Sequence, residues 1–238
     1  MKLDLLAIAP HPDDVELTCG GTMIKMAEAG YRTGILDLTR GETGTRGTPE
    51  TRLQEAARAA KIMGTKTRRN LGLPDAHLCI SEEYKAAIAE VIRELEPRTV
   101  ILPYWEGRHP DHYTAARLGY EACFVAGLKN YPLRGEAFRP FKIVYAAAYA
   151  DVRPTLAVDI TKQYDRRRRA ILAYASQFRP VGRARQSKVP LPLDELEGRM
   201  NDTARHYGRM IGVKYAEGFV VKEVLQAEDI VQMPVRSL

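Results

Sequence analysis

Two short segments of the sequence place imidazole and carboxylate groups in nearly the same order. Residues 11–14 read HPDD and residues 109–112 read HPDH, and a further acid, Glu16, follows the first segment. A helix start needs only one Asp as its cap. Carboxylates packed this closely repel one another unless a cation or protons offset their charge. The two segments therefore predict a site that holds a cation and can move protons.

Together the segments offer two nitrogen ligands and one oxygen ligand, with polar groups left over. Three protein ligands and one open position for water are the pattern of a catalytic zinc site. Magnesium fits less well because it prefers all-oxygen surroundings. Imidazole and carboxylate also suit iron or cobalt, so the residues alone favour zinc and leave those two metals open.

Each segment by itself also has a structural interpretation. A single His at a helix start is more often a cap or a surface residue than a ligand. Asp13 and Asp14 would then be ordinary N-terminal helix charges, favoured by the helix dipole. The occurrence of both segments, each after an apolar run typical of a strand, is what favours the metal site.

Apolar runs alternate with segments of helical periodicity along the whole chain, which predicts repeated β-α-β units. We expect helices at 20–29, 49–63, 82–95, 111–126, 161–177 and 193–211. The expected strands cover 3–9, 33–38, 67–71, 99–102, 143–149 and 156–160, with a short one from 218 onward. The predicted fold class is α/β, with a mainly parallel sheet, helices on both faces, and one domain over residues 1–238.

In such sheets, ligands bind beyond the carboxyl ends of the strands. The HPDD segment follows the strand at 3–9, and the HPDH segment lies in the loop after the strand at 99–102. Both would meet at one edge of the sheet. Residues 178–192 contain four Arg or Lys and three Pro, and we expect them to form a loop over that edge.

The composition is that of an ordinary globular protein: 238 residues, 45% hydrophobic and 28% charged, with a net charge of +6. That charge would suit nucleic acid, a membrane surface or an acidic substrate. The densest basic run, residues 166–169, lies in an expected helix without interleaved aromatic residues for base stacking. No apolar stretch approaches the ~20 residues of a membrane span. We expect a basic enzyme without a nucleic-acid or membrane partner.

The three cysteines, Cys19, Cys79 and Cys123, form no CxxC pair, and their odd number argues against a disulfide framework. A reducing cytosol is the expected compartment. Residues 1–10 contain a short apolar run followed at once by the HPDD segment, which favours a buried strand over a signal peptide.

The HPDD and HPDH segments resemble the two signatures of the LmbE/PIG-L zinc deacetylases, and residues 39–44 (TRGETG) resemble the T-x-G-E-x-G loop of that family. The resemblance covers nearly the whole chain and implies a Rossmann-like fold. Other segments resemble more closely the branch that deacetylates N-acetylglucosaminyl malate in bacillithiol biosynthesis: 47–52, 71–75, 175–178 and 212–219.

The resemblance implies that His11, Asp14 and His112 bind Zn²⁺ and that Asp13 is the general base. It further implies that His109 stabilises the oxyanion and protonates the leaving amine.

The resemblance also assigns Asp111 to orienting the His109 ring, and Arg52 and Asp75 to contacts with the sugar. The malate part of the substrate carries two carboxylates, which Arg108 and Lys188 would reach from their loops; otherwise both are solvated surface cations. Related enzymes carry a mobile Tyr after the segment at 175–178, and Leu196 stands at about that place here.

The predicted activity is hydrolysis of the acetamide of an N-acetylglucosaminyl small molecule, in a homo-oligomer because relatives form trimers and hexamers. One alternative is a zinc deacetylase of another sugar, such as a chitin fragment or a glycolipid precursor. The other is a nucleotide-binding α/β module, which the sequence disfavours because the two segments put acid where phosphate would bind.

Overall fold

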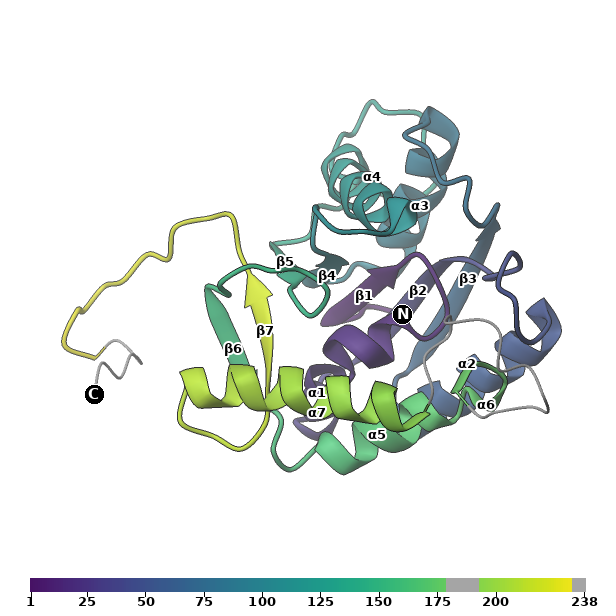
Figure 1. The fold of residues 1–238 in the computed structure, drawn as a ribbon. Helices are drawn as coiled ribbons and strands as arrows, with labels where there is room; N and C mark the ends of the chain where they lie inside the picture. The colour runs from purple at the N-terminus through teal and green to yellow at the C-terminus, as the bar shows by residue number, and fades with distance from the viewer. Residues whose placement is uncertain (179–192, 233–238) are drawn as a thin grey trace.

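The computed structural model describes residues 1–178 and 193–232, and its centre is a seven-stranded sheet of order β3-β2-β1-β4-β5-β7-β6 (Figure 1). The strands are β1 (Leu5–Ala9), β2 (Thr33–Thr39), β3 (Thr67–Leu73), β4 (Thr99–Pro103), β5 (Lys142–Ala146), β6 (Leu156–Asp159) and β7 (Ala216–Val220). The first five pair in parallel, whereas β7 is antiparallel to both β5 and β6. The predicted mainly parallel α/β sheet is confirmed.

Helices cover both faces of the sheet. In Figure 1, α3 (Glu82–Leu95) and α4 (Pro110–Ala126) lie above it. The opposite face carries α1 (Asp14–Glu28), α2 (Pro49–Met63), α5 (Tyr164–Leu172), α6 (Ala175–Phe178) and α7 (Leu193–Met210). Every residue of β1 and β2 is buried, as expected for parallel strands that are covered on both sides.

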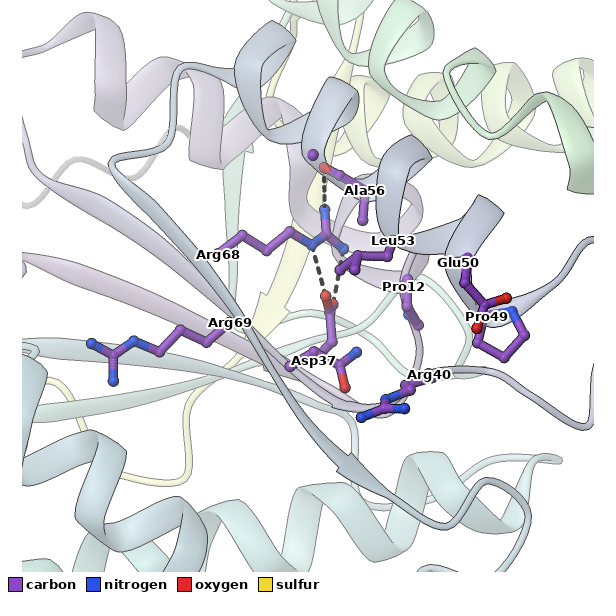
Figure 2. A pocket seen from close by; sticks show the side chains of 11 residues that line it. Pro12, Asp37, Arg40, Pro49, Glu50, Leu53, Ala56, Arg68 and Arg69 are labelled. Carbon is purple, nitrogen blue, oxygen red and sulfur yellow. Dashed lines mark hydrogen bonds and ion pairs between the residues drawn. The ribbon is translucent and has the colours of Figure 1, made fainter.

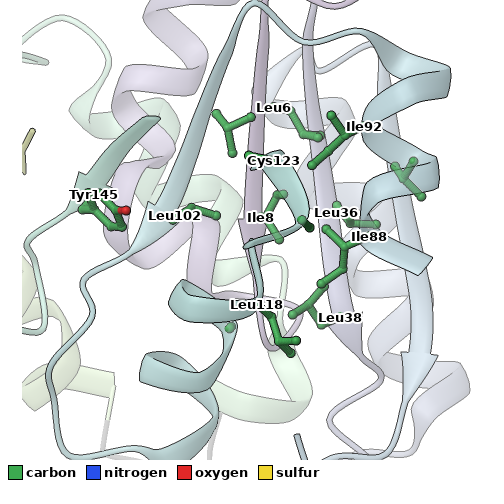
Figure 3. Packing of buried hydrophobic residues seen from close by; sticks show 14 of the residues in the cluster. Leu6, Ile8, Leu36, Leu38, Ile88, Ile92, Leu102, Leu118, Cys123 and Tyr145 are labelled. Atoms are coloured by element: carbon green, nitrogen blue, oxygen red, sulfur yellow. The ribbon is translucent and has the colours of Figure 1, made fainter. Parts of the chain in front are cut away.

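Successive side chains of β1 point to opposite faces and enter two different cores. Leu6 and Ile8 pack with Leu36, Ile88 and Leu118 under α3 and α4, as Figure 3 shows. The alternate residues of the same strand pack against α1, α2 and α5 on the other face. The two cores fix β1 rigidly, and with it the segment that follows Ala9.

Two helices, α2 and α3, lie where their capping residues predict. Pro49 is the first residue of α2, and the Thr48 side chain accepts a hydrogen bond from the Thr51 N–H at 3.2 Å. Gly64 ends the helix with φ = 77°, a conformation that favours glycine. Ser81 caps α3 in the same way as Thr48 caps α2.

Three expected elements differ from the structure by more than two residues at one end or in continuity. Helix α1 begins at Asp14 instead of residue 20 and has a non-helical residue at Cys19, because its first turn carries buried acids rather than an apolar stripe. The expected helix at 161–177 is two helices, separated where the fully buried Tyr174 reaches Glu16. Strand β5 ends at Ala146, because the chain turns there with an Ala150 N–H to Ala147 O bond.

None of the helices among residues 1–178 and 193–232 has the length and apolar character that crossing a bilayer would require.

Replacing Ile88 by Ala should lower the free energy of unfolding by about 2–5 kcal/mol, because the side chain is fully buried against the sheet and its removal leaves a cavity. Urea denaturation measures this change. Ile80→Ala is the matched control, since Ile80 is 38% exposed and should change stability by no more than about 0.5 kcal/mol. Equal losses in the two variants would contradict this account of the core.

Candidate metal and active site

The loops that follow β1, β3 and β4 meet at the carboxyl edge of the sheet. His11 comes directly after Pro10 at the end of β1, and His109 is the N-cap residue of α4, which follows β4. The His11 ring centroid lies 5.0 Å from that of His109 and 5.5 Å from that of His112. The two segments are almost 100 residues apart in the chain, and the parallel sheet brings them together.

The turn after His11 has an unusual backbone. Asp13 has φ = 108° and ψ = −26°, in the left-handed region that L side chains rarely adopt. Such a conformation costs about 1–3 kcal/mol and persists only where the surroundings enforce it. Arg52 of α2 holds Asp13 in this conformation, because its Nη2 donates to Pro12 O at 2.7 Å and to Asp13 Oδ2 at 3.2 Å.

One set of donor atoms at this edge surrounds a common point. His11 Nδ1 lies 3.1 Å from Asp14 Oδ2, and His112 Nε2 lies 3.4 Å from Asp14 Oδ1. One ligand atom from each of the three residues lies within 4.8 Å of the others. Two imidazole nitrogens and a carboxylate at these separations fit a single cation with a position left for water or substrate.

A second set, His11, His109 and Asp111, meets the same distance criterion. Its groups are already engaged, because His109 Nδ1 accepts the Asp111 N–H at 3.2 Å and Asp111 Oδ2 accepts the Ala76 N–H at 2.9 Å. His109 is also exposed, whereas Asp14 is buried. The first set is therefore the better cation site.

Two carboxylates face the other nitrogen of His11. Its Nε2 lies 3.0 Å from Asp75 Oδ1 and 3.2 Å from Asp111 Oδ2. Carboxylates at this position keep the proton of a metal-binding histidine on Nε2 and leave Nδ1 as the ligand atom. Burial lowers the pKa of His11, but hydrogen bonds to Asp111, Asp14 and Asp75 outweigh burial and raise it to about 12. The surrounding acids thus favour positive charge at this point.

The adjacent carboxylates Asp13 and Asp14 differ in their acidity. Burial raises the pKa of Asp13 to about 7, although the positive charge of Arg52 opposes the rise. For Asp14, burial also raises the pKa, but the charges and hydrogen bonds of His112 and His11 outweigh it and lower the pKa below its usual range. Asp14 is therefore suited to remain ionised as a ligand, and Asp13 to exchange a proton near neutral pH.

The structure places the carboxylates of Asp111 and Asp75 beside His11, while the roles that the resemblance assigns to both residues stay predictions. The carboxylate of Asp111 contacts His11 and not the ring of His109, because the Ala76 N–H and His11 Nε2 face it. Asp75 is buried, and its carboxylate accepts hydrogen bonds from the N–H and hydroxyl of Thr43 as well as facing His11.

The other expected substrate contacts are placed as follows. Arg52 is buried beside Asp13, and Arg108 is exposed in the loop before α4. Lys188 and most of the expected loop at 178–192 lie outside the described residues. Leu196 belongs to α7 and is buried in the core that faces α1, so it does not take the place of a loop Tyr.

Two residues near the site escaped the sequence analysis. The ring of Tyr149 lies 5.4 Å from that of His112, in the turn after β5, although the apolar pattern predicts strand there. Thr43 holds Asp75 from the loop after β2. The position of both residues just beyond a strand end is the signal that identifies them.

A pocket of about 440 Å³ lies between α2 and strands β2 and β3, next to this site (Figure 2). Pro12 contributes to its lining, but the described lining residues include none of the three donor residues. Figure 2 shows the guanidinium of Arg68 beside Asp37 in this pocket, where Nε and Oδ2 are 2.7 Å apart. Arg40 and Arg69 add further positive charge to the lining, whereas the metal-binding edge is rich in carboxylates, so the two sites differ in charge.

Several known proteins are similar to this chain in sequence or in fold. A diacetylchitobiose deacetylase from Thermococcus kodakarensis is 34% identical over 228 residues, covering 90% of this chain and 81% of that protein. A probable N-acetyl-α-D-glucosaminyl L-malate deacetylase 2 from Bacillus cereus is 29% identical over 196 residues, covering 74% and 84%.

Among solved structures, a conserved protein from Thermus thermophilus superimposes with a TM-score of 0.86 at 42% identity, covering 95% of this chain and 98% of that one. The N,N′-diacetylchitobiose deacetylase from Pyrococcus horikoshii gives a TM-score of 0.79 at 27% identity, covering 91% and 82%. The Rossmann-like architecture expected from the family resemblance is confirmed.

The family model PIG-L, described as GlcNAc-PI de-N-acetylase, matches residues 6–123, which contain both the HPDD and the HPDH segment. With this match and a deacetylase relative aligned over most of both chains, the chain belongs to the PIG-L/LmbE family of deacetylases and is a hydrolase.

Proposed function

We propose that this protein is a zinc-dependent N-deacetylase that hydrolyses the acetamide of an N-acetylglucosaminyl conjugate to acetate and a free sugar amine. The observation that carries the proposal is the grouping of His11 Nδ1, Asp14 and His112 Nε2 around one point, with Asp13 next to them. The donor set, two imidazoles and one carboxylate, suits zinc better than magnesium.

Zinc bound by these three residues would polarise the acetamide carbonyl and lower the pKa of the attacking water. Asp13 accepts a proton from that water as the water oxygen forms a bond to the carbonyl carbon. The C–N bond then breaks, and the proton held by Asp13 passes to the departing nitrogen. Burial raises the pKa of Asp13 and so favours its acceptance of the proton in the first transfer.

His109 would stabilise the negative charge that develops on the carbonyl oxygen. Because its Nδ1 accepts the Asp111 N–H, the ring proton lies on Nε2, which is the atom free to donate a hydrogen bond. This arrangement supports His109 as a hydrogen-bond donor to the oxyanion more than as the imidazolium acid implied by the family resemblance. Asp13 is then the source of the proton for the amine.

Two N-acetylglucosaminyl substrates have specific support. The 34% identity to a diacetylchitobiose deacetylase favours a substrate in which a second sugar is linked to the sugar that carries the acetamide. The exposed Arg108 and the similarity to a probable malate deacetylase favour an anionic neighbour. The scissile acetamide is the same in both, so the metal and Asp13 serve either substrate.

Removing the metal should abolish acetate release. We expect a chelator to inactivate the enzyme and added Zn²⁺ to restore it, measured as acetate formed from N-acetylglucosaminyl malate and from diacetylchitobiose. His112→Ala should lose bound zinc, since it removes one of three protein ligands. Full activity in thoroughly chelated protein would exclude the proposed mechanism.

Asp13→Asn should keep bound zinc but lower kcat by about 10²–10⁴-fold, because the amide cannot accept the proton of the attacking water. Turnover and zinc content are measured on the same preparation. Asp202→Asn is the control, since Asp202 is exposed on α7, which supplies none of the three donor residues. Near wild-type turnover of the Asp13 variant would show that another group is the base.

Arg108→Ala should raise KM for N-acetylglucosaminyl malate by about tenfold, because the variant loses one charge-assisted hydrogen bond to the substrate. KM for diacetylchitobiose should stay nearly unchanged. Lys129→Ala is the control, because Lys129 is a cation beyond the opposite end of α4. Equal effects of Arg108→Ala on the two substrates would remove Arg108 from the recognition of an anionic group.

A further inference from the structure

The helix that supplies Asp14 is divided in two. Cys19 has φ = −144° and ψ = 16°, so residues 14–18 form little more than one helical turn before the regular part of α1 begins. A break of this kind leaves carbonyl groups before it and N–H groups after it without helical partners. A single turn is also unstable by itself, because helix formation requires a costly nucleus.

One buried ion pair satisfies the free groups on both sides of the break. Arg167 from α5 donates from Nε to Glu16 O at 3.1 Å and from Nη2 to Leu17 O at 2.5 Å. Glu217 from β7 accepts the N–H groups of Gly21 and Thr22 at 2.8 and 2.7 Å. The two side chains are 3.1 Å apart, and the residues are 4% and 3% exposed, respectively.

The regular part of α1 is fixed tightly against the rest of the protein. A Cβ atom at Gly21 would lie 2.8 Å from the side chain of Ile160, so only glycine permits this approach. Gly21 thus serves close packing. The short turn carries two buried acids, Asp14 and Glu16, beside the buried Val15, so polar contacts as well as apolar packing set its position.

The short turn has a second anchor on its other side. The Glu16 side chain lies 2.5 Å from Arg68 Nη1 and accepts a hydrogen bond from the Tyr174 hydroxyl at 3.0 Å. Arg68 in turn pairs with Asp37 of β2. The turn is therefore held at its backbone by Arg167 and at a side chain by Arg68.

We propose that Arg167 and Glu217 are positioning residues of the metal site, which cap the two sides of the break in α1 and so hold Asp13 and Asp14 at the place the reaction requires. The inference rests on the proposed function. Arg167 acts on the turn through the carbonyl groups of Glu16 and Leu17 rather than through a metal donor. This gives a role to Glu217, which lies in the segment 212–219.

The test compares Arg167→Lys and Glu217→Gln with wild type in the full-length protein. Zn²⁺ dissociation constants are measured by competition with a chelating dye, together with Tm, kcat and KM for diacetylchitobiose. We expect the dissociation constant for zinc to rise about tenfold or more in both variants, within the range known for outer-shell changes. We expect kcat to fall and KM to stay within about twofold.

Arg93→Lys is the matched control. Arg93 is a buried arginine that also caps helix carbonyl groups, donating to Ala126 O at 3.0 Å and Leu128 O at 2.7 Å. It acts at the end of α4 opposite to His112. Its replacement should lower Tm and leave zinc affinity and kcat at the wild-type level.

Wild-type zinc affinity and kcat in Arg167→Lys and Glu217→Gln, with Tm lowered as in the control, would overturn the inference and leave the pair a purely stabilising role. If Glu217→Gln fails to fold by circular dichroism, Arg167→Lys decides, since lysine retains one donor. His112→Ala is measured in parallel. If that variant bound zinc as tightly as wild type, the metal site itself would be wrong, and the inference would fall with it.

Discussion

The site depends on the burial of several carboxylates around one imidazole. Asp14, Asp75 and Asp111 are buried, and all three lie within 3.2 Å of a His11 nitrogen. Acids removed from water are costly unless positive charge accompanies them. Positive charge where His11, Asp14 and His112 converge would offset these acids, so the same electrostatic need that favours an ionised Asp14 also favours a cation beside it.

The residues of the site come from both faces of the sheet. Strand β1 delivers His11 from the middle of the sheet, and α4 delivers His112 from the face covered by α3 and α4. Asp13 and Asp14 come from the opposite face, on a turn whose left-handed residue is enforced by Arg52. Buried arginines on that face bind backbone carbonyls of the turn, so rigid packing and polar contacts together set the ligand positions.

The sheet also separates the groups that would act on the acetamide from those that would contact the rest of the substrate. Asp13 and the three metal donors, which would act on the acetamide, lie at the strand ends and are largely shielded from solvent. Arg108, which would contact the neighbouring part of the substrate, lies in an exposed loop. Changes in such loops alter recognition without disturbing the shielded ligands.

The sequence by itself determined the order of strands and helices along the chain, the caps of α2 and α3, and the two segments that carry the proposed metal donors. Those features are local: Ser81 and Pro49 act within one turn of their helices. It also predicted correctly that both segments follow strand ends, because parallel strands share one carboxyl edge.

Only the tertiary structure decided which groups face one another across that edge. It placed Asp111 and Asp75 on His11, split α1 at Cys19, and joined Arg167 to Glu217 through the break. These contacts join residues far apart in the chain, and no periodicity or spacing encodes them. The physical reason is that a buried charge pairs with a group that lies near it in space. The packing of the whole sheet and its helices sets that distance.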